Sequence, residues 1–132
     1  MTSRRDLITD YFRRQYETRE GSTEDNVNGL FAEDLVFHLT GDLSMGRGDL
    51  ITLCDLLRRT RHDRSTMVTR FEEADDLVSF VLYLVGTDPV TGHEASVSTR
   101  TEYRFVDDMV VEVWQENPAA VEAAVRAAGV RP

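Results

Sequence analysis

The chain has 132 residues, a net charge of −9 and one cysteine, Cys54, so an internal disulfide is excluded and a reducing, cytoplasmic compartment is expected. A chain of this length buries roughly 68% of its unfolded surface, which predicts one self-sufficient domain over residues 1–132. All fifteen basic residues are arginines, which excludes lysine Schiff-base chemistry, and the acidic balance opposes binding to nucleic acid or to an anionic membrane.

The N-terminal third is predicted to be helical. Thr2 or Ser3 can cap a first helix that ends near Gly21 and whose apolar residues recur at helical spacing: Leu7, Ile8, Tyr11, Phe12 and Tyr16. Ser22 or Thr23 can cap a short second helix with the apolar stripe Val27, Leu30 and Phe31.

A short strand and a third helix follow. The segment "LVFHLT" (35–40) alternates as a strand and carries His38, and "GDLSMGRG" (41–48) is a turn-rich loop. The segment "DLITLCDLLRRT" (49–60) begins with an acid and ends with arginines, which matches a helix dipole. Cys54 lies on its apolar face, where a small core residue is expected.

From Thr66 onward the sequence is rich in the residues typical of strands. The predicted strands are 66–73, 77–87, 93–105 and 109–115, and each gap between them holds a turn signal. This order predicts an antiparallel meander, and a closing helix is expected at 117–129 with Pro118 in its first turn. No cysteine pair, histidine-ligand spacing or phosphate-binding glycine pattern is present, so no metal site and no cofactor are expected.

Helices followed by a curled sheet define an α+β domain, and the sheet must bury one face against the helices. In the third strand of the meander one face is expected to point inward: Ala95, Val97, Thr99, Thr101, Tyr103 and Phe105. The opposite face carries mixed charge and is expected to be solvated or to contact a second subunit.

The segment "LFAEDLVFHLTGD", the following "GRGDLITL", the pair "EYRF" and "VVEVW", and the closing helix resemble the nuclear transport factor 2-like superfamily. Within it the chain is similar to SnoaL-like polyketide cyclases and ketosteroid-isomerase-like proteins. The resemblance implies a single SnoaL-like domain with a cystatin-like α+β roll. In this cone a strongly bent, mixed or antiparallel sheet wraps the N-terminal helices around a pocket, and members are commonly homodimers.

The resemblance also implies catalytic residues. His38 falls where ketosteroid isomerases place the carboxylate that moves a proton, and an imidazole suits proton transfer near neutral pH. Thr101 falls at the position of the isomerase's protonated acid, and the isomerase's tyrosine falls near Gln15, which leaves Tyr16 as the candidate donor. SnoaL-like cyclases carry an acid directly after the last-strand tryptophan, where this chain has Gln115.

The expected pocket is mostly apolar and suits a flat, hydrophobic, enolisable molecule. Its substrate-binding residues are expected to be Tyr11, Phe12, Leu53, Leu57, Tyr83, Tyr103, Trp114 and Gln115, with Val36 or Phe37, Val81 and Val97 as further wall residues. Whether Trp114 or Gln115 faces the pocket is left open by the sequence.

Three functions remain open. The first is proton transfer next to a carbonyl, as isomerisation or aldol-type cyclisation of a polyketide- or steroid-like substrate, with His38 as base. The second is non-catalytic binding of such a molecule by an accessory protein of the same fold. The third is epoxide hydrolysis, which needs an inward-facing aspartate that the sequence does not clearly offer.

Overall fold

A computed structural model describes residues 2–39, 41–60, 65–87 and 92–116. The helical elements are α1 (Arg4–Phe12), the π-helical segment η1 (Arg13–Glu17), α2 (Thr23–Leu30) and α3 (Arg47–Thr60). The strands are β1 (Phe31–His38), β2 (Ser44–Met45), β3 (Ser65–Ala74), β4 (Leu77–Thr87), β5 (Glu94–Val106) and β6 (Met109–Gln115).

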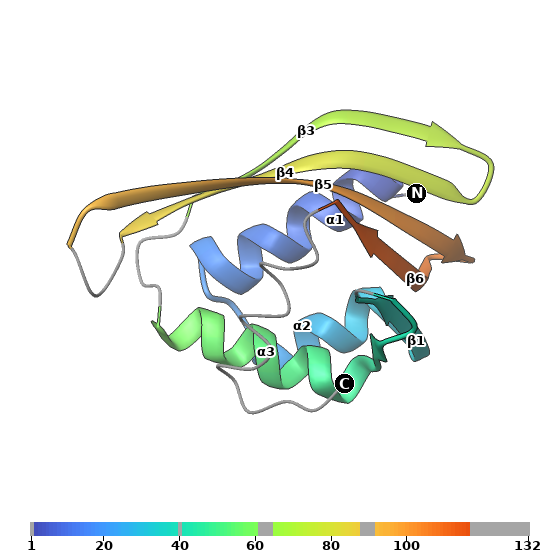
Figure 1. Cartoon of the computed structure of the whole chain (residues 1–132), viewed down its shortest axis with the longest axis horizontal. Helices are drawn as coiled ribbons and strands as arrows, with labels where there is room; N and C mark the ends of the chain where they lie inside the picture. The colour runs from blue at the N-terminus through green and yellow to red at the C-terminus, as the bar shows by residue number, and fades with distance from the viewer. Residues whose placement is uncertain (1, 40, 61–64, 88–91, 117–132) are drawn as a thin grey trace.

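The strands form one six-stranded sheet in the order β2-β1-β6-β5-β4-β3. The meander from β3 to β6 is antiparallel throughout, as the sequence predicts. The last strand inserts beside the first, and β1 runs parallel to β6, which makes the sheet mixed. In Figure 1 the long strands β3, β4 and β5 curve over α1, with α2 and α3 beneath it. The predicted α+β cone, a bent sheet around the N-terminal helices, is confirmed.

The core lies between the concave face of the sheet and the helices. It contains buried apolar side chains from every helix and from all six strands, among them Ile8, Val27, Phe31, Leu53, Met45, Val68, Val78, Phe80, Phe105 and Val110. Phe80 and Tyr103 meet edge to face with ring centroids 5.1 Å apart, and Phe31 approaches Tyr103 at 5.7 Å. These aromatic contacts connect β1, β4 and β5 on the inner face of the sheet.

Local sequence signals place the helix starts. Ser3 accepts a hydrogen bond from the Asp6 amide and Ser22 accepts one from the Asp25 amide, so one of the two candidate caps is used at each helix. Phe31 was expected on the second helix and instead begins β1, where its ring packs against Tyr103. The expected closing helix at 117–129 lies outside the described residues.

Two bulges change which side chains face inward. In β3 the register shifts between Thr69 and Glu72, where Arg70 has a φ of +51°, and Phe71 consequently packs against the core. In β6 a register shift between the partners of Arg104 and Phe105 buries both Val110 and Val113, although they are three residues apart. Strict alternation therefore fails along both strands.

Within the described ranges, every helix is too short or too polar to cross a membrane.

Candidate functional site

His38 lies at the end of β1 on the outer face of the sheet. Its neighbours Phe37 and Leu39 are buried toward the helices, and successive side chains of a strand point to opposite faces. The His38 side chain is 36% exposed. The expectation that this imidazole projects into the interior of the cone is therefore wrong, because the apolar residues of β1 turn it outward.

On that outer face His38 belongs to a three-residue polar cluster. Its Nε2 lies 2.6 Å from Oε2 of Glu112, and Oε1 of the same carboxylate accepts a hydrogen bond from Nε of Arg104 at 2.9 Å. The three residues come from the neighbouring strands β1, β6 and β5. The hydrogen bond with His38, followed by that from Arg104, lowers the pKa of Glu112 from its ordinary value. This carboxylate is therefore held in its charged form.

Trp114 also lies on the outer face, beside His38. The indole and imidazole rings stack with centroids 5.2 Å apart and an interplanar angle of 11°. A hollow of about 290 Å³ next to the indole is lined by Arg100, Glu102, Trp114, Gln115 and Glu116. The pairing of β6 with β5 shows which of Trp114 and Gln115 faces the interior. Trp114 lies opposite the outward Glu102, so it faces away from the expected pocket. Gln115 lies opposite the inward Thr101, so it faces the interior.

Thr101 and Gln115 bring a polar pair to the inner side of the sheet. Thr101 is 1% exposed, and Nε2 of Gln115 donates to its Oγ1 over 3.5 Å. The carbonyl oxygen of the Gln115 side chain is buried and has no hydrogen-bond partner within the described ranges. Because buried polar atoms are nearly always paired, this oxygen is an acceptor that no donor of the described residues uses.

The aromatic residues expected to line a pocket pack on one another. Tyr11, Phe12 and Tyr103 are each no more than 7% exposed. Tyr11 contacts Phe12 and Phe31 at 5.0 and 5.3 Å between ring centroids. Of the two α3 residues expected there, Leu53 is buried in the same core and Leu57 is partly buried against it. A ligand at this point would have to separate these rings.

Tyr83 was expected in the pocket wall, and that expectation is wrong. Phe80 and Leu82 of β4 are buried, so Tyr83 faces outward, where it is 43% exposed and pairs with Met67 of β3. The apolar segment "LVSFVLYLV" has large side chains at both alternating positions, so its inner face was ambiguous from sequence. Val81 pairs with Arg100 and lies on the same outer face as Tyr83.

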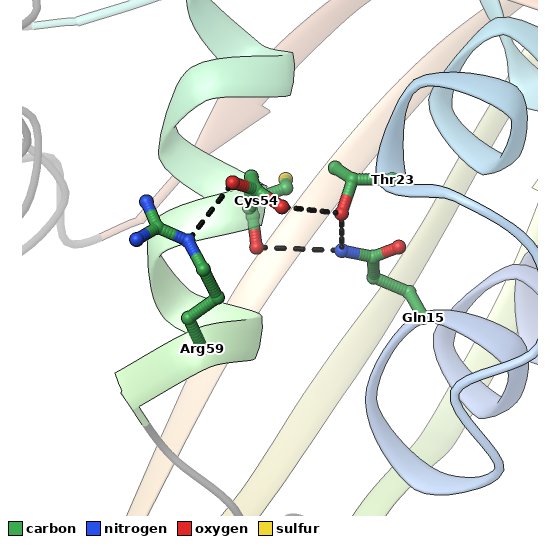
Figure 2. A network of polar contacts seen from close by, with 5 residues as sticks. Gln15, Thr23, Cys54 and Arg59 are labelled. Atoms are coloured by element: carbon green, nitrogen blue, oxygen red, sulfur yellow. Dashed lines mark hydrogen bonds and ion pairs between the residues drawn. The ribbon is translucent and has the colours of Figure 1, made fainter.

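Tyr16 and Gln15 lie in the π-helical segment η1. Tyr16 is buried and stacks on Phe12. Gln15 is fully buried, and its Nε2 donates to Thr23 Oγ1 at 3.0 Å and to the Cys54 carbonyl at 3.3 Å. Figure 2 shows this network, which continues from Thr23 through an aspartate of α3 to Arg59. Gln15 is thus committed to holding the helices together.

The interior contains phenols and neutral polar groups. Burial, followed by nearby Cys54, raises the pKa values of Tyr11 and Tyr103 well above their ordinary range. The buried polar residues of the described chain are Gln15, Thr23 and Thr101, so this part of the interior holds no buried carboxylate or imidazole.

Sequence reasoning missed Glu112 and Arg104 as the partners of His38. The outward direction of Arg104 follows from its alternation with Tyr103, which the sequence does suggest, whereas the sequence leaves the face of Glu112 open. The missing information was the parallel pairing of β1 with β6, which brings Val36 opposite Glu112 although the two are far apart in the chain.

No protein-family model matches the chain, and no curated protein matches it either. Solved structures do match. AclR from Streptomyces galilaeus, described as a candidate hydroxylase, is 21% identical and superposes with a TM-score of 0.71 over 98% of this chain and 86% of its own. A candidate SnoaL-like polyketide cyclase from Jannaschia sp. CCS1 is 16% identical, with a TM-score of 0.70 over 94% of this chain and 92% of its own. IdmH from Streptomyces antibioticus, described as a candidate polyketide cyclase, is 19% identical, with a TM-score of 0.71 over 95% and 99%.

The chain has the SnoaL-like cone fold. The resemblance recognised in the sequence is thus confirmed for the fold. At these identities the likeness does not carry an activity across, because this fold hosts unrelated functions and the site must supply the argument.

Proposed function

We propose that the chain binds a hydrophobic small molecule of polyketide- or steroid-like shape between the concave face of the sheet and the helices. The observation that carries this proposal is the buried carbonyl oxygen of Gln115, which accepts no hydrogen bond from the described residues and lies next to the buried hydroxyl of Thr101. A ligand hydroxyl would donate to that oxygen while its flat skeleton contacts the aromatic core. The SnoaL-like fold of the chain is consistent with such a ligand.

We favour binding without catalysis over proton transfer. His38, the candidate base, faces outward and is engaged by Glu112. Thr101 and the Gln115 amide do not exchange protons near neutral pH, and the buried phenols of Tyr11 and Tyr103 are held protonated. In the proposed complex, the hydroxyl of Tyr16 donates a hydrogen bond to the ligand. Epoxide hydrolysis is disfavoured because the described interior offers no buried aspartate.

Entry of the ligand requires the ring cluster to open. The rings of Phe12, Phe80 and Tyr103 are linked by edge contacts rather than by covalent or ionic ties, so they can separate at a modest loss of contact energy. A flat ligand can enter between such rings and replace the contacts that they lose. Gln115 is only half-buried, so in this proposal the ligand approaches the rings from the side of Gln115.

The test is a thermal-shift and calorimetric screen of the whole chain against aromatic polyketides and hydroxysteroids. A true ligand at a hundredfold excess over its dissociation constant should add about 2.7 kcal/mol of stability. Gln115→Leu should weaken binding about tenfold, because one hydrogen bond to a buried acceptor is lost. The same variant without ligand should be no less stable than the parent, since it removes an unsatisfied buried oxygen.

Thr101→Val should also weaken binding, whereas His38→Ala should leave the dissociation constant unchanged. If Gln115→Leu instead destabilised the free protein and left binding intact, an ordered water would be the partner of the carbonyl oxygen and the proposal would fail. Turnover of a β,γ-unsaturated ketosteroid by the parent protein, abolished by His38→Ala, would replace binding with isomerase activity.

We further propose that the protein is a cytoplasmic homodimer assembled through the outer face of the sheet. Support comes from Met67 and Tyr83, which pair across β3 and β4 and are 60% and 43% exposed. Exposed large apolar side chains that lie together favour a protein contact. Cys54 is the single cysteine of the chain, forms no disulfide and is buried, which is compatible with a reducing compartment.

A further inference from the structure

The outer face carries a second feature that the interior site does not use. Because β6 lies between β1 and β5, the side chains of these strands form a row across the sheet. His38 of β1 covers one side of the Trp114 indole. The 290 Å³ hollow borders the indole together with Arg100 and Glu102 of β5, which places it on the side away from His38.

Trp114 is therefore supported on one side and accessible on the other. The stacked imidazole is itself held by Glu112, and Arg104 anchors that carboxylate. This chain of contacts keeps the indole in a fixed orientation. A planar group in the hollow would make the third layer of a stack that already contains two rings.

The charges around the hollow select the kind of planar group. Glu102 and Glu116 supply two carboxylates against one guanidinium, that of Arg100, and across the described ranges none of the three forms an ion pair. The other basic side chains nearby, His38 and Arg104, are already engaged with Glu112. The net charge of the chain, −9, adds to the attraction for a cation.

We propose that this hollow binds a planar aromatic cation, stacked on Trp114 and attracted by Glu102 and Glu116. The face of an indole is the strongest aromatic partner for a cation, and the two carboxylates supply the complementary charge. This site lies on the outer face at β5 and β6 and shares only Gln115 with the interior binding proposed above. The proposed dimer contact at Met67 and Tyr83 lies on β3 and β4.

The test is an NMR titration of the whole chain with three probes that share one ring system: N-methylquinolinium, neutral quinoline and quinoline carboxylate. Trp114 is the only tryptophan, so its indole N–H gives one assignable peak. The cation should shift that peak with a dissociation constant on the order of a millimolar, about fivefold tighter than neutral quinoline, and the anion weakest.

Charge variants provide the sharpest control, because they act in opposite directions without removing the indole. Glu102→Gln should weaken binding of the cation, and Arg100→Gln should tighten it. Trp114→Leu should abolish binding, measured on the probe's own resonances. Thr101→Val, on the inner face, should change nothing.

Equal affinities for the three probes, tighter binding of the carboxylate, or an Arg100→Gln variant that binds the cation no better than the parent would each overturn the proposal. A loss of the cation's binding in Thr101→Val would also overturn it, by assigning the probe to the interior.

Discussion

Glu112 uses a single carboxylate to connect three strands. One of its oxygens binds His38 of β1 and the other binds Arg104 of β5, while Glu112 itself belongs to the intervening β6. Hydrogen bonds to a charged partner are stronger than those between neutral groups. The cluster therefore stabilises the pairing of β1, β6 and β5 on the outer face of the sheet.

The lowered pKa of Glu112 predicts how the stabilising effect of this cluster depends on pH. A carboxyl whose folded pKa lies below its unfolded value stabilises the protein above the ordinary pKa of 4.5, and that contribution is lost as the pH falls through the folded pKa. Glu112→Gln should thus be less stable than the parent near pH 6, and the difference should shrink toward about pH 3. Urea unfolding at several pH values measures this difference.

A double-mutant cycle separates the pair from other acid effects. In a His38→Gln background, the same Glu112→Gln change should show a weaker dependence on pH, because the strongest cause of the lowered pKa has been removed. Parallel stability curves for the parent and Glu112→Gln over the whole range would contradict the assignment.

At the level of helices and strands, most of the structure could be predicted from the sequence. The directions of side chains were predicted for β5, where Thr101, Tyr103 and Phe105 are buried as expected, but not for β1, β4 and β6. The serine caps, the turn signals and the strand-rich second half locate the elements because these signals are local. The interior role given to His38 came from the resemblance. The apolar residues Leu35, Phe37 and Leu39 alternate with His38 along the strand and indicate that His38 faces outward. In β6 the bulge breaks the strict alternation, so the sequence alone does not show which side chains face inward.

The buried hydrogen-bond network of η1 joins three helical segments. Gln15 donates to Thr23 on α2 and to the Cys54 carbonyl on α3, and it accepts from Asn26. A π-helical turn is uncommon and needs tertiary contacts to persist. These hydrogen bonds provide them.

Gln15→Leu should therefore destabilise the fold by about 2–3 kcal/mol, because it leaves several buried partners unsatisfied. Arg59→Ala, at the exposed end of the same network, should change stability by less than about 0.5 kcal/mol. Chemical denaturation of both variants measures the contrast. Similar losses in the two variants would show that the surface ion pair, and not the buried amide, supports η1.

For the whole molecule, the proposed dimer is open to a direct measurement. Sedimentation equilibrium should show a concentration-dependent dimer for the parent, and Tyr83→Glu should shift it to monomer because like charges would meet across the contact. Leu43→Glu, an equally exposed position in the loop before β2, should leave the dimer unchanged. A parent protein that is monomeric at all concentrations would exclude this assembly.

The bulge in β3 has a consequence for the protein at high concentration. As the last strand in the sheet order, β3 has no neighbouring strand on its outer edge among the described residues, and such an edge can pair with an extended chain that approaches. The left-handed Arg70 interrupts that edge near its middle, so an incoming strand could keep its register for only a few residues on either side. The same bulge that buries Phe71 thus disfavours the addition of strands from other molecules to this edge of the sheet.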